Sequence, residues 1–240
     1  MHHGGFGATS RRAIVAAGLA AALLLGGCGV PDRLGSVARA LRGGGTPVDP
    51  RTVLSQMQDA ALRGGKVEFQ LDGELATGGG YLDPRSGALK ADVWLPDVGD
   101  LEFLLLDGHA YRKDGDPWDA DWYELDARDL PAMVEVDPAI LADIWSEERV
   151  LATALEDYVE AGIELRRVRL VFPDPPRQEP GEDSGDREVP TITRDLHLDT
   201  EGRPRRIDIW YDRTKVETIR YHEWDAAVEI VAPPLAPVPS

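Results

Sequence analysis

The stretch that decides the fold is ALKADVWLPDVGDLEFLLLDGHAY, residues 88–111. From Leu89 to Leu95 apolar residues occupy every second position, which is the period of a strand buried on one face. A second and more apolar strand follows at 101–106, and Asp107-Gly108 is typical of a two-residue hairpin turn. The stretch therefore predicts antiparallel strands joined by tight turns.

The same alternation continues in both directions from this stretch. Upstream, residues 67–75 alternate apolar side chains with Glu, Gln and Asp, which predicts a half-buried antiparallel strand. The further predicted strands are 122–125, 165–172, 192–198, 206–212, 216–222 and 227–231. Glycine, proline and polar residues between strands predict turns at 78–80, 83–87, 200–202 and 212–214.

Three segments carry a helical pattern instead. Asp49-Pro50 is a helix-start signal, because Asp caps free amides and Pro is favoured at the first helical position; the apolar stripe ends at Gly64. Asp137-Pro138 repeats this signal before a second apolar stripe. Residues 150–159, followed by Gly162, predict a third helix that pairs with the second.

The predicted order is helix, antiparallel meander, helix pair, antiparallel meander. A sheet of about eight strands twists and curls, and its apolar face must be covered. The predicted fold class is therefore α+β, a curled antiparallel half-barrel sheet covered on its concave face by helices.

Residues 1–27 are predicted to be a signal peptide. Arg11 and Arg12 precede an apolar run that starts at Ala13 and is too short to span a bilayer comfortably. Leu25-Gly26-Gly27-Cys28 ends the run and resembles the bacterial lipobox, which implies cleavage before Cys28 and a diacylglycerol thioether on it. The Arg-Arg pair also fits twin-arginine export, so both export routes stay open.

The mature chain is predicted to have three parts. Residues 28–48 form the lipidated N-terminus and a tether, 49–234 form one domain that includes a mobile acidic loop at 173–190, and 235–240 form a tail. Cleavage removes two arginines and no acidic residue, which leaves a net charge of −19. Since an anionic leaflet repels such a domain, we expect acyl chains to hold it at the extracytoplasmic face of the cell membrane.

Composition and motifs argue against several functions. The chain has 26 Lys+Arg and 43 Asp+Glu, a net charge of −17, which is unsuited to nucleic acid. Its one cysteine excludes an intramolecular disulfide and a cysteine-based zinc cluster. The sequence has no nucleophile elbow, zincin helix or phosphate-binding loop, so we predict no enzyme, no catalytic residue and no cofactor. A paired-carboxylate hydrolase remains a third hypothesis.

Two groups of residues can be considered as cation sites, although we predict no metal. Asp195, His197 and Asp199 share one face of a strand, which fits a metal site and also fits any solvated strand face. The acidic segment 114–121 offers carboxylates to a hard cation, but it fails the register of an EF-hand. Two further histidines have no partner at a plausible spacing: His109 and His222.

Several strand and turn segments occur in an order that is similar to a known family. These segments are Leu104-Leu105-Leu106-Asp107-Gly108-His109-Ala110-Tyr111, Leu196-His197-Leu198-Asp199, Ile207-Asp208-Ile209, and Trp224 before 228–234. With the lipobox, they resemble the mycobacterial LppX/LprG-type lipoproteins and, more distantly, the LolA/LolB carriers, over about residues 49–234. The resemblance implies a hydrophobic cavity between sheet and helices that holds the acyl chains of a lipid, glycolipid or lipoprotein. The acidic segment 173–190 departs from the family pattern.

The expected lining of this cavity is the inward-facing set on the strands and the middle helix: Val67, Phe69, Leu71, Val93, Phe103, Leu105, Ile140, Leu141 and Ile144. The alternative, that these side chains pack on the helices and leave no cavity, stays open. The leading hypothesis is a membrane-anchored carrier or chaperone of lipid or glycolipid in the cell envelope. The second is a sensor or scaffold lipoprotein that presents its sheet edge or acidic loop to an envelope protein partner.

Overall fold

The protein is described by a computed structural model. The residues that it describes are 45–74, 76–114, 122–125, 136–147, 150–173, 191–211 and 214–233. The predicted signal peptide, the lipobox, the segment 174–190 and the tail 235–240 lie outside these ranges, as does most of the acidic segment 114–121.

The first helix, α3 (Pro50–Gly64), confirms the prediction from its start signal. The Asp49 carboxylate accepts hydrogen bonds from the backbone amides of Arg51 and Thr52 at 3.2 and 3.3 Å, so it caps amides that have no partner within the helix. The helix ends at Gly64 and is capped by Gly65, whose φ of 74° suits glycine. Its buried face is the predicted stripe: Val53, Leu54, Met57, Ala60 and Ala61.

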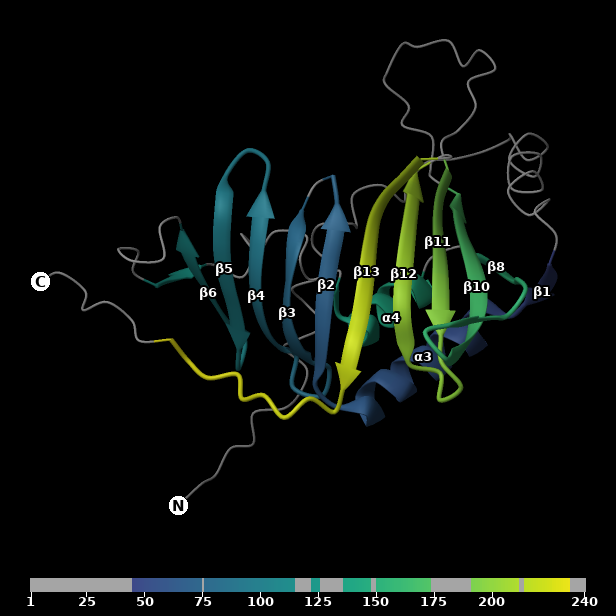
Figure 1. The fold of residues 1–240 in the computed structure, drawn as a ribbon, viewed down its shortest axis with the longest axis horizontal. Helices are drawn as coiled ribbons and strands as arrows, with labels where there is room; N and C mark the ends of the chain where they lie inside the picture. Colours follow the sequence, from purple (N-terminus) through teal and green to yellow (C-terminus); the bar gives the residue numbers. More distant parts are fainter. Residues whose placement is uncertain are drawn as a thin grey trace, which may run out of the picture.

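The strands form one antiparallel sheet (Figure 1). Their bounds are β1 Thr46–Val48, β2 Val67–Gly73, β3 Thr77–Asp83, β4 Ala88–Leu95, β5 Gly99–Leu106, β6 His109–Asp114, β7 Tyr123–Leu125, β8 Leu151–Ala154, β9 Tyr158–Glu160, β10 Ile163–Pro173, β11 Thr191–Leu198, β12 Pro204–Tyr211 and β13 Thr214–Trp224. The spatial order is β1-β8-β10-β11-β12-β13-β2-β3-β4-β5-β6-β7, with β9 paired to β10. Among the described strands β1 and β7 are edges, so the sheet is not closed.

Ten of the described strands form two meanders, which are joined to each other by one long-range pairing. The first runs from β2 to β7 and the second from β10 to β13, each between strands that are neighbours in sequence. β13 pairs with β2 through Ile219 opposite Leu71 and Tyr221 opposite Phe69. The C-terminal strand therefore places the second meander beside the first in a single sheet.

Both described helices lie behind the same face of the sheet, across β10 to β13 (Figure 1). The second helix is α4 (Pro138–Glu147), which begins at the predicted Asp137-Pro138 signal. Its Trp145 ring meets the Phe172 ring of β10 edge-on, with 5.8 Å between centroids. The Tyr221 hydroxyl of β13 donates to the carbonyl of Val136 at 2.7 Å, just before α4. These contacts define an inner face of the sheet, which carries the helices, and an outer face.

Four sequence predictions about the elements are wrong. The glycines 78–80 do not form a turn but lie within β3. Residues 150–159 do not form a helix, because they pair as β8 and β9 against β10. Residues 46–48, assigned to the tether, are the edge strand β1. Residues 227–231 do not form a strand; they follow Trp224 without joining the sheet.

Two of these errors have a physical cause in the pairing of strands. The apolar spacing of residues 150–159 fits either period, and the residues that decide between them are Val168 to Val171, the pairing partners on β10. The glycines of β3 are needed because a Cβ at Gly80 would overlap the Lys90 carbonyl oxygen of β4. Each deciding neighbour lies on another strand, so the segment's own apolar or glycine pattern does not show it.

Candidate functional site

The predicted cavity lining is brought together on the inner face. In one row across the sheet Phe69 lies opposite Gly80, Gly80 opposite Ala91, and Ala91 opposite Phe103. The next row places Leu71, Gly78, Val93 and Leu101 side by side. Bulky side chains on β2 and β5 thus flank glycine and alanine positions on β3 and β4. The inner face of this half of the sheet is apolar, and its smallest residues in these two rows are Gly78 and Gly80 of β3.

Eight of the nine predicted lining residues belong to the apolar core or pack against it. The buried ones are Val67, Phe69, Leu71, Val93, Phe103 and Leu141, and the half-buried ones are Leu105 and Ile144. Ile140 is half-buried on α4 and lies outside that cluster. The structure therefore brings eight of the nine residues, from the strands and α4, into one apolar group. Whether a ligand enters this group stays a prediction.

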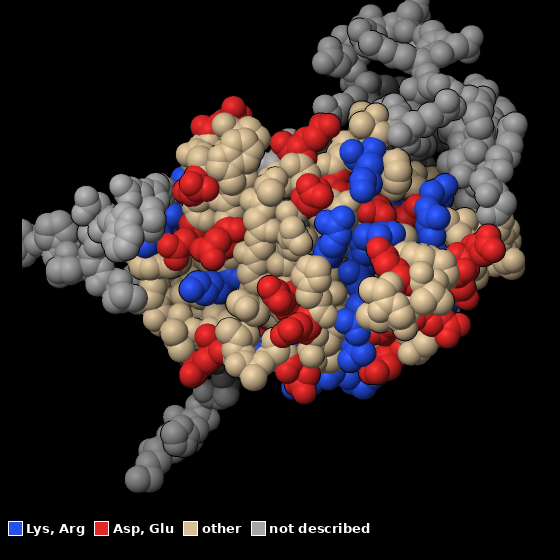
Figure 2. Space-filling model, viewed as in Figure 1, with Lys and Arg blue, Asp and Glu red and all other residues tan. Residues whose placement is uncertain are grey.

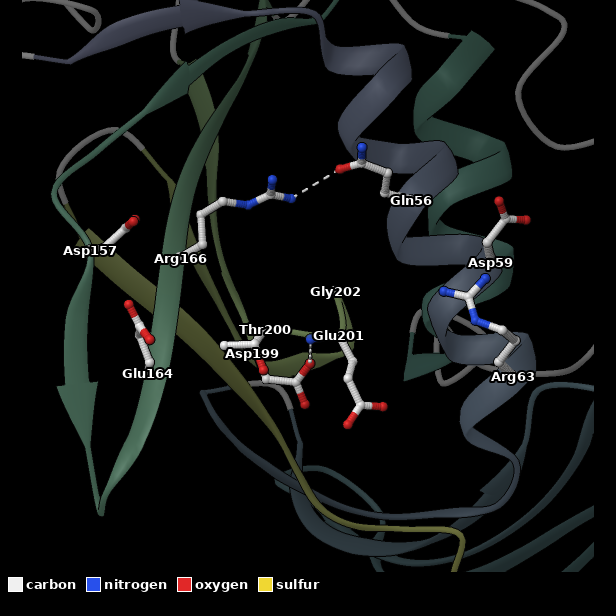
Figure 3. Close-up of a pocket in the computed structure, with 10 residues that line it drawn as sticks. All are labelled: Gln56, Asp59, Arg63, Asp157, Glu164, Arg166, Asp199, Thr200, Glu201 and Gly202. Atoms are coloured by element: carbon white, nitrogen blue, oxygen red, sulfur yellow. Dashed lines mark hydrogen bonds between the residues drawn. The ribbon is translucent and has the colours of Figure 1, made fainter.

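A polar pocket of about 620 Å³ lies on the inner face beside α3 (Figure 3). Its lining comes from α3, from the β9–β10 hairpin with the segment before it, and from the β11–β12 turn: Gln56, Asp59, Arg63, Asp157, Glu164, Arg166, Asp199, Thr200, Glu201 and Gly202. The Arg166 guanidinium donates to the Gln56 side-chain oxygen at 3.3 Å and so connects β10 with α3. None of the nine predicted lining residues belongs to this pocket, and its carboxylates make it unsuited to an acyl chain.

At one wall of this pocket two arginines compensate the negative charge of Asp199. Its carboxylate accepts from the Nε atoms of Arg203 and Arg205, both at 3.0 Å, and from the backbone amides of Glu201 and Arg203. Only 6% of the residue is exposed. These bonds hold the β11–β12 turn in shape, so Asp199 serves the fold and does not offer an open ligand position.

Asp195 is also held by two arginines, on the outer face of the sheet. Arg169 binds both carboxylate oxygens, at 2.7 and 2.8 Å, and Arg167 donates to one of them. Burial by itself would raise the pKa of Asp195, but the hydrogen bonds from Arg169 and Arg167 outweigh it and lower the pKa. The side chain has no exposed surface. The expectation of a solvated strand face is therefore wrong here.

His197 lies next to this pair and is bonded at both ring nitrogens. Nδ1 is 2.7 Å from the Tyr158 hydroxyl and Nε2 is 3.1 Å from the Asp208 carboxylate, which fits a proton on Nε2. Burial opposes ionisation of Asp208, but hydrogen bonds from His197 and Thr218 with the charge of Arg206 lower its pKa to about 2. Because both nitrogens of the imidazole are occupied, this network fastens β9 to the sheet and presents no free base to a substrate.

The three residues considered as metal ligands are bound by other side chains of the protein. Asp195, His197 and Asp199 are each engaged by protein groups, and within the described ranges no cluster of three or more His, Cys, Asp or Glu side chains is arranged to hold a metal ion. His109, which has no partner by sequence spacing, lies 2.6 Å from the Glu124 carboxylate across β6 and β7. Sequence reasoning missed these pairs because each depends on strand register.

Over the residues that the structure describes, the class that the fold defines is an open antiparallel sheet with the helices α3 and α4 on one face. The crystal structure of the lipoprotein LppX from Mycobacterium tuberculosis is similar, with a TM-score of 0.50 and 16% identity over 76% of this chain and 98% of that one. LprF from Mycobacterium bovis is similar with a TM-score of 0.50 and 17% identity over 79% and 99%. The predicted resemblance to LppX/LprG-type proteins is confirmed for the fold.

Sequence comparison adds no closer relative. No family model matches the chain, and no curated protein matches it. In the part of the chain that the structure describes, neither helix has the length and apolar sequence needed to cross a membrane. The fold likeness is therefore what the comparisons contribute.

Proposed function

We propose that this chain is a non-enzymatic, membrane-anchored lipoprotein of the cell envelope that binds a lipid or glycolipid for transport or chaperoning. The apolar inner face of β2–β5, which forms one hydrophobic cluster with residues of α4, is the observation that carries the proposal. The likeness of the fold to LppX and LprF supports it, because the LppX/LprG-type resemblance implies an acyl-chain cavity at this place.

In this proposal the inner face is concave, and α4 closes the cavity as a lid. The wall is formed by the predicted strand residues, from Val67 to Leu105, and the lid by Ile140, Leu141 and Ile144. Leu105, Ile140 and Ile144 are only half-buried, so they leave apolar surface that a lipid would cover. Each buried methylene contributes about 0.8 kcal/mol, so one long acyl chain binds tightly without polar recognition.

The N-terminal part of the proposal is the anchor. A signal peptide at 1–27 delivers the chain, Cys28 carries the lipid, and the residues between Cys28 and β1 act as a tether shorter than predicted, because β1 begins at Thr46. Residues 173–190 and 235–240 are proposed as a peripheral acidic loop and a tail. The net charge of −19 makes the acyl anchor necessary at an anionic leaflet.

The test is mass spectrometry of the full chain from the envelope of an actinobacterial expression host. Native spectra report bound lipid together with any thioether on Cys28, whereas denatured spectra keep only the covalent group. We expect an excess mass in the native state that is lost on denaturation. Identical native and denatured masses would contradict the carrier proposal.

A matched pair of variants localises the ligand. Ile144→Asp places a charge on the lid at a half-buried position, where folding tolerates it better than in the core, and we expect it to reduce co-purified lipid. Val159→Asp makes a comparable change at a residue that is 68% exposed on β9, and we expect it to retain lipid. Equal lipid content in both variants would refute the proposed wall and lid.

A further inference from the structure

The outer face of β2–β6 carries a second surface that the carrier proposal does not use. Strand register arranges its side chains in three rows across the sheet. The first row is Glu68, Tyr81, Lys90, Leu104, Tyr111 and Glu124; the second is Gln70, Gly79, Asp92, Glu102 and Lys113; the third is Asp72, Thr77, Trp94 and Asp100. Figure 2 shows this face, where charged side chains are interspersed with uncharged ones.

Aromatic rings lie on both sides of the middle row. Trp94 is 47% exposed on β4, although tryptophan is normally well buried. Tyr81 and Tyr111 are half-buried two rows away, and rows are separated by about 7 Å along a strand. The His109 ring stacks on Tyr111 with 6.3 Å between centroids and supports it from one side. Trp94 is thus about 14 Å along the strand direction from the tyrosine row.

The middle row is rich in hydrogen-bond acceptors. Gly79 has no side chain, and Asp92 next to it is exposed. Glu102 is oriented by Lys113, whose ammonium lies 3.1 Å from its carboxylate. Gln70 adds an exposed amide at the other end of the row. The surface therefore has hydrogen-bond acceptors in its middle row, Trp94 in the row on one side and Tyr81 and Tyr111 in the row on the other.

These properties match the chemistry of a carbohydrate. The C–H faces of a sugar ring pack on aromatic rings, and its hydroxyl groups donate to carboxylate and amide oxygens, which are acceptors. The three rows contain six carboxylates and two lysines, so the surface repels phosphorylated or uronic-acid sugars. We propose that the outer face of β2–β6 binds a neutral linear polysaccharide, with Trp94 and the two tyrosines stacking on different sugar units.

The experiment uses the full chain with ¹⁵N-labelled tryptophan, in a polyoxyethylene detergent that has no sugar headgroup. Cellohexaose and chitohexaose are the neutral probes, and hexagalacturonate is the anionic probe. We expect a neutral probe to shift the indole signal of Trp94 and to leave the signal of the buried Trp145 in place. Trp94→Phe assigns that signal. Failure of both neutral probes to move it, or equal binding of hexagalacturonate, would overturn the proposal.

Variant affinities, measured by calorimetry, provide the second arm. Trp94→Ala removes a mostly exposed side chain, so the fold should persist, and we expect the affinity for the bound hexasaccharide to fall at least about tenfold. Tyr211→Ala is the matched control, because Tyr211 is 48% exposed on β12 outside the three rows. An equal loss in both variants, or none in Trp94→Ala, would also overturn the proposal.

Discussion

Replacing Asp137 with asparagine should change the pH dependence of stability in a defined direction. Asp137 precedes α4, is 4% exposed, and accepts a hydrogen bond from the Ala139 amide at 2.8 Å. Burial raises its pKa to about 6, although the hydrogen bonds from Ala139 and Ile140 act in the opposite direction. The carboxylate is thus charged at neutral pH in a place that disfavours the charge.

The sign and size follow from proton binding. A pKa raised from 3.8 to about 6 means that the folded protein binds more protons than the unfolded chain between these values. The resulting stabilisation is complete below pH 3.8 and is lost as the pH rises through about 6. A shift of about two units corresponds to about 3 kcal/mol. Asparagine keeps the capping oxygen and does not titrate.

We therefore expect the stability of the wild type relative to Asp137→Asn to fall by about 3 kcal/mol between pH 3.5 and pH 7.5. Urea unfolding followed by tryptophan fluorescence, at several pH values, measures this difference. Asp49→Asn is the matched control at the start of α3. The pKa of Asp49 is lowered, chiefly by its hydrogen bond from Thr52. The stability of the wild type relative to Asp49→Asn should therefore rise, not fall, as the pH increases. A pH-independent difference for Asp137→Asn would refute the reasoning.

Further variants test the hydrogen bonds of Asp208 on the outer face and the need for glycine at position 80 of β3. Asp208→Asn should destabilise the protein by about 2 kcal/mol at pH 7. The reason is that the pKa of Asp208, lowered to about 2, contributes stability above pH 3.8 that is lost as the pH falls through 2. Urea unfolding measures this loss, and an unchanged unfolding midpoint would contradict the role of the Asp208 hydrogen bonds. Gly80→Ala should cost about 1–3 kcal/mol or more, since its Cβ would overlap a carbonyl oxygen of β4. Gly87→Ala meets no atom within 4 Å and retains only the strain of its positive φ, so thermal unfolding should show a smaller loss there.

Local patterns predicted the elements whose cause is local. Asp49 and Asp137 indicated both helix starts, because a cap acts on amides two or three residues away. The hairpin at Asp107-Gly108 was predicted from its turn residues, and both have the positive φ that this turn requires, 53° and 84°. The alternation in β2, β4 and β5 also predicted most of the apolar wall, since side chains two apart share a face whatever strand lies beside them.

Patterns failed where the deciding residue is distant in sequence. Val150 to Val159 has apolar spacing that fits a helix, but β10 provides backbone partners that a helix would leave unused. Arg169 and Asp195 were indistinguishable from solvated strand residues until register placed them opposite each other on β10 and β11. The Asp195 charge is buried because the half-buried guanidinium of Arg169 pairs with it. The sequence of one strand does not reveal which residue of the neighbouring strand lies opposite.

The amino-acid sequence by itself determined where strands alternate, where two helices begin and which residues face the core, because these properties depend on neighbours a few positions away. Only the tertiary structure decided that β13 joins β2, that β1 forms an edge, that the glycines of β3 lie inside a strand, and that charged side chains are buried on the outer face. Pairing and burial are free energies shared between distant segments, so neither partner specifies them alone.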